Sequence, residues 1–191
     1  RNIVIATSAS STFADLLQKL DTESPKHLPT GEEWAALQGA ANSAVEMSDR
    51  IRDTESAIRS HAESHVPSLS ALLGPLLAAR MTVAAHGRSR LSRLPSSTVQ
   101  VLGAEKAFFA HLRTGSPPPK HGMIFQHPWI SRSPRWVRGK ISRLLAGKAS
   151  IAVRVDEHGG KAWGDVEVAA VERAVQAVRS RHPKPPSNRR R

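Results

Sequence analysis

Two histidines in this sequence have the spacing of metal ligands. His61 and His65 lie four residues apart, so on a helix both rings would project from one face toward a single ion. The stretch HAESH has no glutamate directly after its first histidine, and no third ligand accompanies the pair. We therefore favour a solvated position or a place in a helical seam over a metal site, and we expect neither a metal nor another cofactor.

A second set of residues could do acid–base chemistry on phosphate. His121 and His127, with Glu105 nearby in the sequence, are the candidates. Their signal is weak, because histidine beside glycine and proline is ordinary loop composition. The sequence also has no phosphate-binding P-loop, no G-x-S-x-G motif and no carboxylate cluster that would hold Mg²⁺. We expect no catalytic residue, and enzyme activity is the minority hypothesis.

The stretch that begins near Gly103 has the chemistry of a binding surface for RNA. An extended apolar piece with Val99 and Val101 is expected to lead into Gly103-Ala104, where a helix can begin with little side-chain bulk. Backbone N–H groups and the positive end of the helix dipole would then point outward. Such a helix start favours an anionic ligand.

The helix that starts there is expected to be short. It ends at Gly115, a residue type favoured after the last helical turn, and three prolines then impose an extended segment. This segment presents Lys120 and His121 next to Gly122, which supplies charge and a ring on which a base can stack. The residues predicted to contact RNA are Gly103, Ala104, Glu105, Lys106, Arg113, Lys120, His121, Arg132, Arg135, Arg138 and Lys140.

Two adjacent phenylalanines lie on the same short helix. Because Phe108 and Phe109 are neighbours in the sequence, only one of them can face a core squarely. We expect one core residue and one interface residue, and either ring could instead stack on a base. Phe108, Phe109 and Leu91 are the predicted contacts to a protein partner.

The composition favours a helical protein. The sequence has 191 residues, of which 39% are hydrophobic, with four Phe, four Trp and no Tyr. This composition suits closely packed helices, and we predict an all-α fold. The absence of cysteine excludes disulfides and thiolate metal sites. No apolar run reaches transmembrane length and no signal peptide is visible, so we expect an intracellular protein without a membrane partner.

The charge divides the chain into two parts. Residues 1–66 carry six Lys and Arg against ten Asp and Glu, a net charge of −4. Residues 67–191 carry 22 against six, a net charge of +16. The basic part predicts a polyanionic partner, with binding that weakens steeply as salt is raised.

Five helical segments should position these residues. A capping box at Thr30 and Glu33 starts a long helix that Pro67 ends, and its thin apolar seam favours packing against another arm. Ser68 is expected to cap the next helix, which Gly74-Pro75 kinks. A basic helical turn covers 88–94, an extended piece 123–125 and a turn 127–129. A basic helix over 134–157 is expected to be capped by Ser133, and a last helix by Asp165.

Three stretches together resemble a known domain. They are VLGAEKAFFAHLRTGSPPPKHGMIF, GKISRLLAGKASIAVRVD and PSLSALLGPLLAARM, which resemble the Nop domain in the same order along the chain. This domain occurs in the archaeal box C/D ribonucleoprotein scaffold, in its nucleolar relatives and in a pre-mRNA splicing factor. The resemblance implies a helical arm at 1–66 with a tip loop and a long coiled-coil helix, and a Nop domain at 67–182. The composition of the last residues predicts a disordered basic tail at 183–191.

The resemblance implies a non-catalytic scaffold. Its expected ligand is kink-turn RNA together with a ribosomal-type protein that binds the kink-turn, in the machinery of guide-directed RNA 2'-O-methylation. In the family, the segment matching Gly103–Lys106 lies against RNA, and the loop matching Pro119–Gly122 orders on it. Members usually have Arg where this chain has Ala110, which removes one such side chain.

Further partners and alternatives also follow from the resemblance. Fibrillarin is an expected partner through a region outside these residues, and the helical arm is expected to self-associate. The location would be cytoplasmic in an archaeon and nucleolar or nuclear in a eukaryote. The alternatives are a spliceosomal scaffold on a small nuclear RNA and a protein–protein adaptor with an acidic partner.

Overall fold

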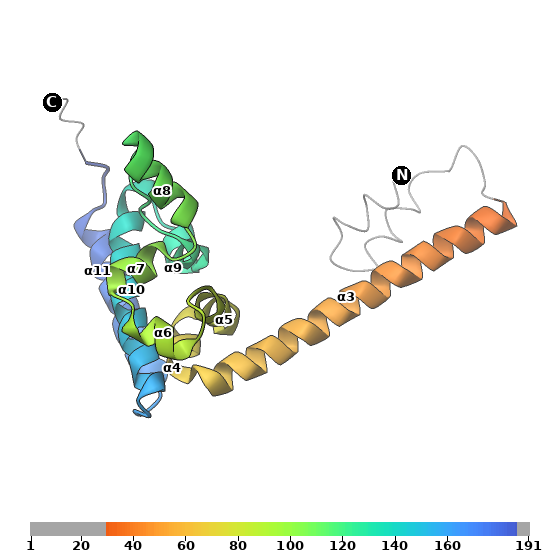
Figure 1. Ribbon diagram of the computed structural model, residues 1–191, viewed down its shortest axis with the longest axis horizontal. Coiled ribbons are helices and arrows are strands. Elements are labelled where there is room, and N and C mark those ends of the chain that lie inside the picture. The colour runs from red at the N-terminus through yellow and green to blue at the C-terminus, as the bar shows by residue number, and fades with distance from the viewer. Residues whose placement is uncertain (1–29, 187–191) are drawn as a thin grey trace. The chain divides into compact units, whose positions relative to one another are not determined.

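The computed structural model describes residues 30–186, which form helices and short connections with no strand among them (Figure 1). The prediction of an all-α fold is confirmed. The chain divides into two compact units, with the boundary after Thr54. The expected tip loop in residues 1–29, and residues 187–191 of the expected tail, lie outside the described residues.

The long predicted helix is present as α3, Gly31–His65. Its capping box forms as expected, because the backbone N–H of Thr30 donates to the Glu33 carboxylate at 2.8 Å and the backbone N–H of Glu33 donates to the Thr30 hydroxyl at 3.4 Å. Trp34 and Ile51 in its apolar stripe are exposed. The stripe is therefore open to solvent at these two residues, whereas Ala62 near the end of the helix is buried.

The second unit is organised around α10, Arg135–Glu157. This helix packs most extensively against α7 (Ser96–Val101), α4 (Pro67–Leu73) and α6 (Arg88–Arg93), and α11 (Asp165–Arg181) also lies against it (Figure 1). Its spacing of apolar residues explains this central position, because one face is buried along most of its length. The fully buried large side chains of the unit include Leu69, Leu72, Met81, Leu91, Ile124, Ile130, Ile141 and Leu145.

Gly74 separates α4 from α5, Pro75–Ala84. Its φ of +81° lies in the left-handed region that glycine tolerates, and Pro75 then begins α5 because its missing N–H is not needed in a first turn. Among the described residues no single helix has the length and apolar content to span a membrane, whereas α4 and α5, bent by 118°, pass that test as a pair by length and composition only.

The start of α4 is fixed by the end of α10. The Asp156 carboxylate accepts hydrogen bonds from the backbone N–H groups of Ser68 at 2.8 Å and Leu69 at 3.0 Å. It thus caps a helix whose own N-cap residue, Val66, has no polar side chain. The expectation that Ser68 is the cap is wrong, because Ser68 lies inside the first turn and its hydroxyl accepts from the backbone N–H of Trp163.

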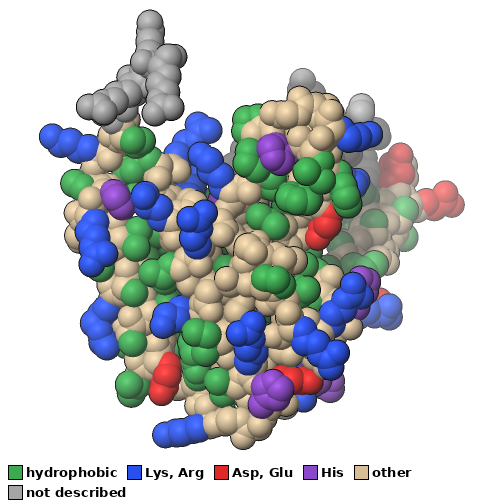
Figure 2. Space-filling model, turned by 60° about the vertical axis from the view of Figure 1, so that its left-hand side comes forward, with side chains coloured by type: hydrophobic (Ala, Val, Ile, Leu, Met, Phe, Trp, Pro, Cys, Tyr) green, Lys and Arg blue, Asp and Glu red, His purple; other side chains and the backbone are tan. Residues whose placement is uncertain are grey.

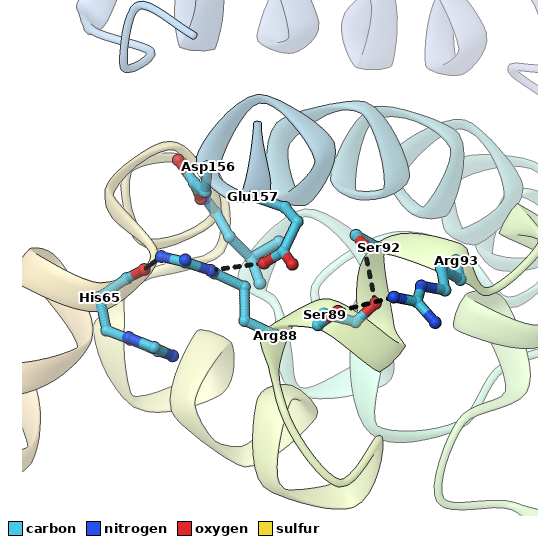
Figure 3. A network of polar contacts seen from close by, with 8 residues as sticks. His65, Arg88, Ser89, Ser92, Arg93, Asp156 and Glu157 are labelled. Atoms are coloured by element: carbon cyan, nitrogen blue, oxygen red, sulfur yellow. Dashed lines mark hydrogen bonds and ion pairs between the residues drawn. The ribbon is translucent and has the colours of Figure 1, made fainter. Parts of the chain in front are cut away.

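An arginine connects the end of α3 to the end of α10. Arg88 donates to the Glu157 carboxylate at 2.8 Å and to the last carbonyl of α3, that of His65, at 2.9 Å (Figure 3). The contact to Arg88 lowers the pKa of Glu157. A positive charge at this place also suits the negative end of the α3 dipole.

Two segments expected to be extended are helical. Val99 and Val101 belong to α7, where Pro95 is the N-cap and Val99 is buried. Met123–Gln126 forms a 3₁₀ turn, η1, in which Ile124 is buried. The expectation of extended pieces is wrong, because both segments form helical turns that place Val99 and Ile124 in the buried core.

One turn and two helix caps differ from expectation. The turn predicted at 127–129 is the start of a short helix, α9, Pro128–Ser131. The N-cap of α10 is Pro134, while the Ser133 hydroxyl donates to the Trp129 carbonyl. Gly164 is the N-cap of α11, and its backbone N–H donates to Glu167 at 2.9 Å. The Ser133 side chain is therefore engaged by a backbone carbonyl of α9 instead of capping α10.

Candidate nucleic-acid interface

The loop between α8 (Glu105–Thr114) and η1 is tied to α7 by its backbone. Gly122 donates its N–H to the Gln100 carbonyl at 2.8 Å, and the Gln100 amide donates to the Lys120 carbonyl at 2.6 Å. A Cβ atom at Gly122 would lie 2.0 Å from the Leu102 carbonyl oxygen. Only glycine fits this contact, so the predicted PKHG loop has one fixed backbone position next to α7.

The turn before α8 also depends on glycine. Gly103 has a φ of +82°, and its N–H donates to the Glu105 carboxylate at 2.7 Å. Ala104 is the N-cap of α8, and its methyl group has no atom that can accept from the first turn. The expected helix start with little side-chain bulk is therefore present, while Glu105 is engaged in the turn.

The side chains of α8 face outward. Its ten residues are all described, and none of them is buried. Phe108, Phe109 and Leu112, here called the apolar row, are 42%, 59% and 64% exposed. The two phenyl rings meet edge to face at 6.3 Å between centroids. The expectation that one of them is a core residue is wrong, because α8 does not lay a face on the core.

The third predicted contact to a protein partner has the opposite environment. Leu91 is 1% exposed and belongs to the hydrophobic core with α10. Its side chain cannot touch a partner, so this prediction is wrong. The short basic helix α6 hides its apolar residue in the core and leaves its arginines at the surface.

Lys120 and His121 lie against the first turns of α10. A Cβ atom on Gly139 would be in ordinary contact, at 3.8 Å, with Cβ and Cδ of Lys120, so this side chain runs beside the start of α10. The His121 ring stacks on Phe125 at 4.6 Å with an angle of 21° between the planes. Burial, with smaller effects of the Arg138 and Lys120 charges, lowers the pKa of His121.

Arg138 completes a stack that we call the His121 stack, formed by His121, Phe125 and Arg138. Its guanidinium carbon lies 5.4 Å from the centre of the Phe125 ring. It also donates to the carbonyls of Ser133 at 2.8 Å and Ser131 at 3.0 Å. Sequence reasoning missed Phe125, although its place directly after the PKHG loop was a usable signal.

His127 is a structural residue. Its Nδ1 accepts from the backbone N–H of Trp129 at 3.2 Å, and its ring meets Trp129 edge to face at 4.7 Å. It is 8% exposed, and burial lowers its pKa to about 4. A ring that is buried, neutral and used as an N-cap for α9 is engaged in folding, and no substrate reaches it.

The remaining predicted cations are exposed at two places. Lys106 and Arg113 lie on α8, while Arg132, Arg135 and Lys140 lie on α9's C-cap and the first turns of α10. Figure 2 shows Lys and Arg side chains spread over one face of the molecule, with few acidic side chains among them. The loop and the start of α10 bring Lys120, His121 and Arg138 into one region.

The histidine pair with the spacing of metal ligands lies elsewhere. His61 and His65 are exposed near the end of α3 and line an apolar groove of about 180 Å³ with residues of α5, among them Val83. Within residues 30–186, no group of three or more His, Asp or Glu side chains is placed to hold a metal ion. The preference for a seam position agrees with the groove.

A helical domain with these motifs matches one family of known proteins. Residues 7–178 match the Nop family, described as "snoRNA binding domain, fibrillarin", and the chain belongs to this family. An uncharacterised NOP5 family protein of Methanocaldococcus jannaschii is 48% identical over 119 residues, which cover 62% of this chain and 28% of the relative.

Eukaryotic nucleolar proteins are also similar. Nucleolar protein 56 of Mus musculus is 40% identical over 120 residues, covering 63% of this chain and 21% of the relative. Nucleolar protein 58 of Aspergillus terreus is 37% identical over 125 residues, covering 65% of this chain and 22% of the relative. The chain thus spans about a quarter or less of the length of these two nucleolar relatives.

A solved structure has the same fold. The crystal structure of a fibrillarin/Nop5p complex contains a chain that matches with a TM-score of 0.61 and 25% identity, covering 93% of this chain and 65% of that one. The relation to the archaeal and nucleolar branches of the Nop family, expected from the GAEK and PKHG stretches, is confirmed.

Proposed function

We propose that this chain is a non-catalytic, RNA-binding scaffold of box C/D-type ribonucleoproteins, which guide RNA 2'-O-methylation. The observation that carries this proposal is the match of most of the chain to a family described as a snoRNA-binding domain. The net charge of +16 on residues 67–191 supports a polyanionic ligand.

The proposed ligand is a kink-turn RNA together with the protein already bound to that kink-turn. Two adjacent kinds of surface support a composite ligand. The apolar row on α8 leaves three large side chains open to solvent, which suits a protein better than a phosphate backbone. Lys106 and Arg113 on the same helix, and Lys120 in the following loop, suit RNA.

The RNA side of this surface combines backbone, charge and a ring. The uncapped first turn of α8 after Gly103-Ala104 offers backbone N–H groups, and Lys120 offers a charge. The neutral His121 ring can stack on a base, since single-stranded RNA is recognised largely by stacking. Arg132, Arg135 and Lys140 extend the positive charge along the start of α10.

A titration tests whether the ligand is composite. Fluorescence anisotropy of a labelled kink-turn RNA, with and without its kink-turn protein, should show a gain in affinity of about 5–150-fold when that protein is present. Binding to free RNA should be weak and should weaken steeply as salt is raised. Equal affinities with and without the kink-turn protein would remove the composite ligand from the proposal.

Single substitutions separate the two sides of the surface. Lys120→Ala and His121→Ala should weaken the ternary complex without changing the helical circular dichroism. Phe109→Ala should reduce only the gain that the kink-turn protein provides, because its ring belongs to the protein side. Lys161→Ala is a matched control, since it removes one exposed charge beyond the opposite end of α10. Loss of helix in either loop variant would instead show that these residues are structural.

The wider assembly is part of the same proposal. Fibrillarin, which forms the solved complex with the matching Nop5p chain, would join this chain through residues outside the surface described above. The arm would support self-association, because Trp34 and Ile51 are exposed on α3. The chain would work in the nucleolus of a eukaryote or in the cytoplasm of an archaeon.

Crosslinking with sequencing of the attached RNA separates the alternatives. Box C/D RNA would support the proposed function, whereas a small nuclear RNA would assign the chain to a spliceosomal scaffold. A complex that survives nuclease treatment with no RNA attached would favour an adaptor that binds an acidic protein. The exposed apolar row favours a protein component in every case.

A further inference from the structure

We propose that Arg138 is a positioning residue, which holds Phe125 and His121 in their stack and does not itself contact RNA. This inference rests on the proposed function in one respect, namely that the ligand of His121 is RNA. A basic residue at the start of a basic helix is expected to meet phosphate, so the assignment to positioning depends on where its guanidinium lies.

The guanidinium of Arg138 is anchored to the backbone. Its Nε donates to the Ser133 carbonyl at 2.8 Å and its Nη2 donates to the Ser131 carbonyl at 3.0 Å. The Ser131 carbonyl is the last one of α9 and the Ser133 carbonyl lies in the connection to α10, so Arg138 ties its guanidinium to the junction of the two helices. Both bonds use the fixed fork of the guanidinium, and together they set its plane.

The anchored guanidinium then fixes an aromatic ring. Its carbon atom is 5.4 Å from the centre of the Phe125 ring, within the range of a cation–π contact. Phe125 in turn stacks on His121 at 4.6 Å, with the two planes 21° apart. Arg138, Phe125 and His121 therefore form a row in which each member limits the orientation of the next.

The backbone of this loop is fixed independently. Gln100 holds the carbonyl of Lys120 and accepts from Gly122, so the residues on both sides of His121 are tied to α7. The fixed backbone does not determine the side-chain orientation of His121. The contacts from Arg138 to Phe125 and from Phe125 to His121 determine it. A ring held in advance loses less entropy when it binds a base.

Burial and the nearby charges support the same role. Burial first, then the charges of Arg138 and Lys120, lower the pKa of His121, so the ring is neutral at pH 7 and can stack on both Phe125 and a base. Lysine at position 138 would keep the charge but lack the planar fork that reaches two carbonyls. Arg138→Lys and Arg138→Gln are therefore informative as a pair.

The first experiment uses the free protein and needs no ligand. Proton NMR should show the His121 ring signals shifted by the Phe125 ring current, and Arg138→Lys should move them toward the positions of an unstacked histidine. Phe125→Leu should move them further, because it removes the ring and keeps an apolar side chain. Unchanged His121 signals in the folded Arg138→Lys protein would overturn the proposal.

The second experiment measures binding of a kink-turn RNA carrying its kink-turn protein at several salt concentrations. If Arg138 positions His121, Arg138→Lys and Arg138→Gln both weaken binding about tenfold, the size of one lost base stack, and leave the salt dependence unchanged. If Arg138 contacts phosphate, Arg138→Lys retains most of the affinity, and Arg138→Gln lowers the slope of log K against log salt by about 1. That second pattern would overturn the proposal.

The two experiments also separate this inference from the proposed function. Wild-type protein that gains nothing from the kink-turn protein would contradict the proposed function, whereas the NMR result in the free protein would still stand or fall by itself. Circular dichroism and urea unfolding confirm that each variant is folded. If Arg138→Lys does not fold, Arg138→Gln supplies both readouts: a moved His121 signal with an unchanged salt slope supports positioning, and a slope lowered by about 1 overturns it.

Discussion

The helices α8 and α10 differ in how they use similar residues. Each carries large apolar and basic side chains, but α10 buries Val137, Ile141 and Leu145, whereas all ten residues of α8 are described and none is buried. Apolar residues at helical spacing show that a surface will be covered. They do not show whether the chain itself or a partner covers it.

The two helices are also held in place differently. α10 is held along its whole length by the helices around it. α8 has ten residues, too few to be stable alone in water, and is held at its ends by Gly103, by the left-handed Gly115 and by the loop tied to α7. A helix held at its ends can present a full face to a ligand.

The largest effect on the free energy of unfolding is expected from a leucine-to-alanine substitution, made once in α10 and once in α8. Leu145 is fully buried, so Leu145→Ala should lower the free energy of unfolding by about 2–5 kcal/mol. Leu112 is 64% exposed, so Leu112→Ala should change it by at most about 0.5 kcal/mol. Urea unfolding measures both. Similar losses would mean that α8 packs on the domain and that the comparison is wrong.

The buried His127 and the half-buried His121 should differ in how they affect the free energy of unfolding. The pKa of His127 is about 4 in the folded protein, against about 6.5 in the unfolded chain, so the unfolded chain binds the proton more tightly. The free energy of unfolding is therefore unaffected by this group above about pH 6.5. It falls as the pH is lowered toward 4, by about 3 kcal/mol in total. Urea unfolding at about pH 7 and pH 4.5 should show most of this loss.

A matched pair of variants checks the assignment. His127→Asn keeps an acceptor for the first turn of α9 and cannot titrate, so it should remove that part of the pH dependence. His121→Ala should leave the stability at pH 7 nearly unchanged, because this ring lies half-buried in the loop. An unchanged pH dependence in His127→Asn would show that other groups cause it.

Smaller changes in stability are expected when either of two glycines is replaced by alanine. Gly122→Ala would place Cβ 2.0 Å from the Leu102 carbonyl oxygen, so the loop must shift, at a cost of about 1–3 kcal/mol and with weaker ternary binding. Gly147→Ala in α10 meets nothing within 4 Å and should stabilise the helix by about 0.5–1 kcal/mol. Thermal unfolding and the ternary titration measure both; Gly122→Ala with wild-type values would show that the loop position does not matter.

Local rules predicted the ends of several helices. The capping box at Thr30 and Glu33, the stop at Pro67 and the helix end at Gly115 depend on neighbouring residues only, and all three are present. The residue types in the GAEK and PKHG stretches also indicated the family before any contact was known. Such features are readable because the interactions that cause them span a few residues.

Contacts between distant segments decided the rest. Val99 is buried because α7 packs against α10, and Ser68 is not a cap because Asp156, 88 residues away, takes that role. Burial of Leu91 and exposure of Phe108 likewise depend on which helices meet.

The sequence by itself determined that the chain is helical, basic after residue 66 and a member of the Nop family. Only the tertiary structure decided that His127 supports α9, that Arg138 lies over Phe125 and that α8 leaves its apolar row open. The reason is physical: composition and short-range spacing set which elements form, whereas the environment of each side chain depends on elements brought together from far along the chain.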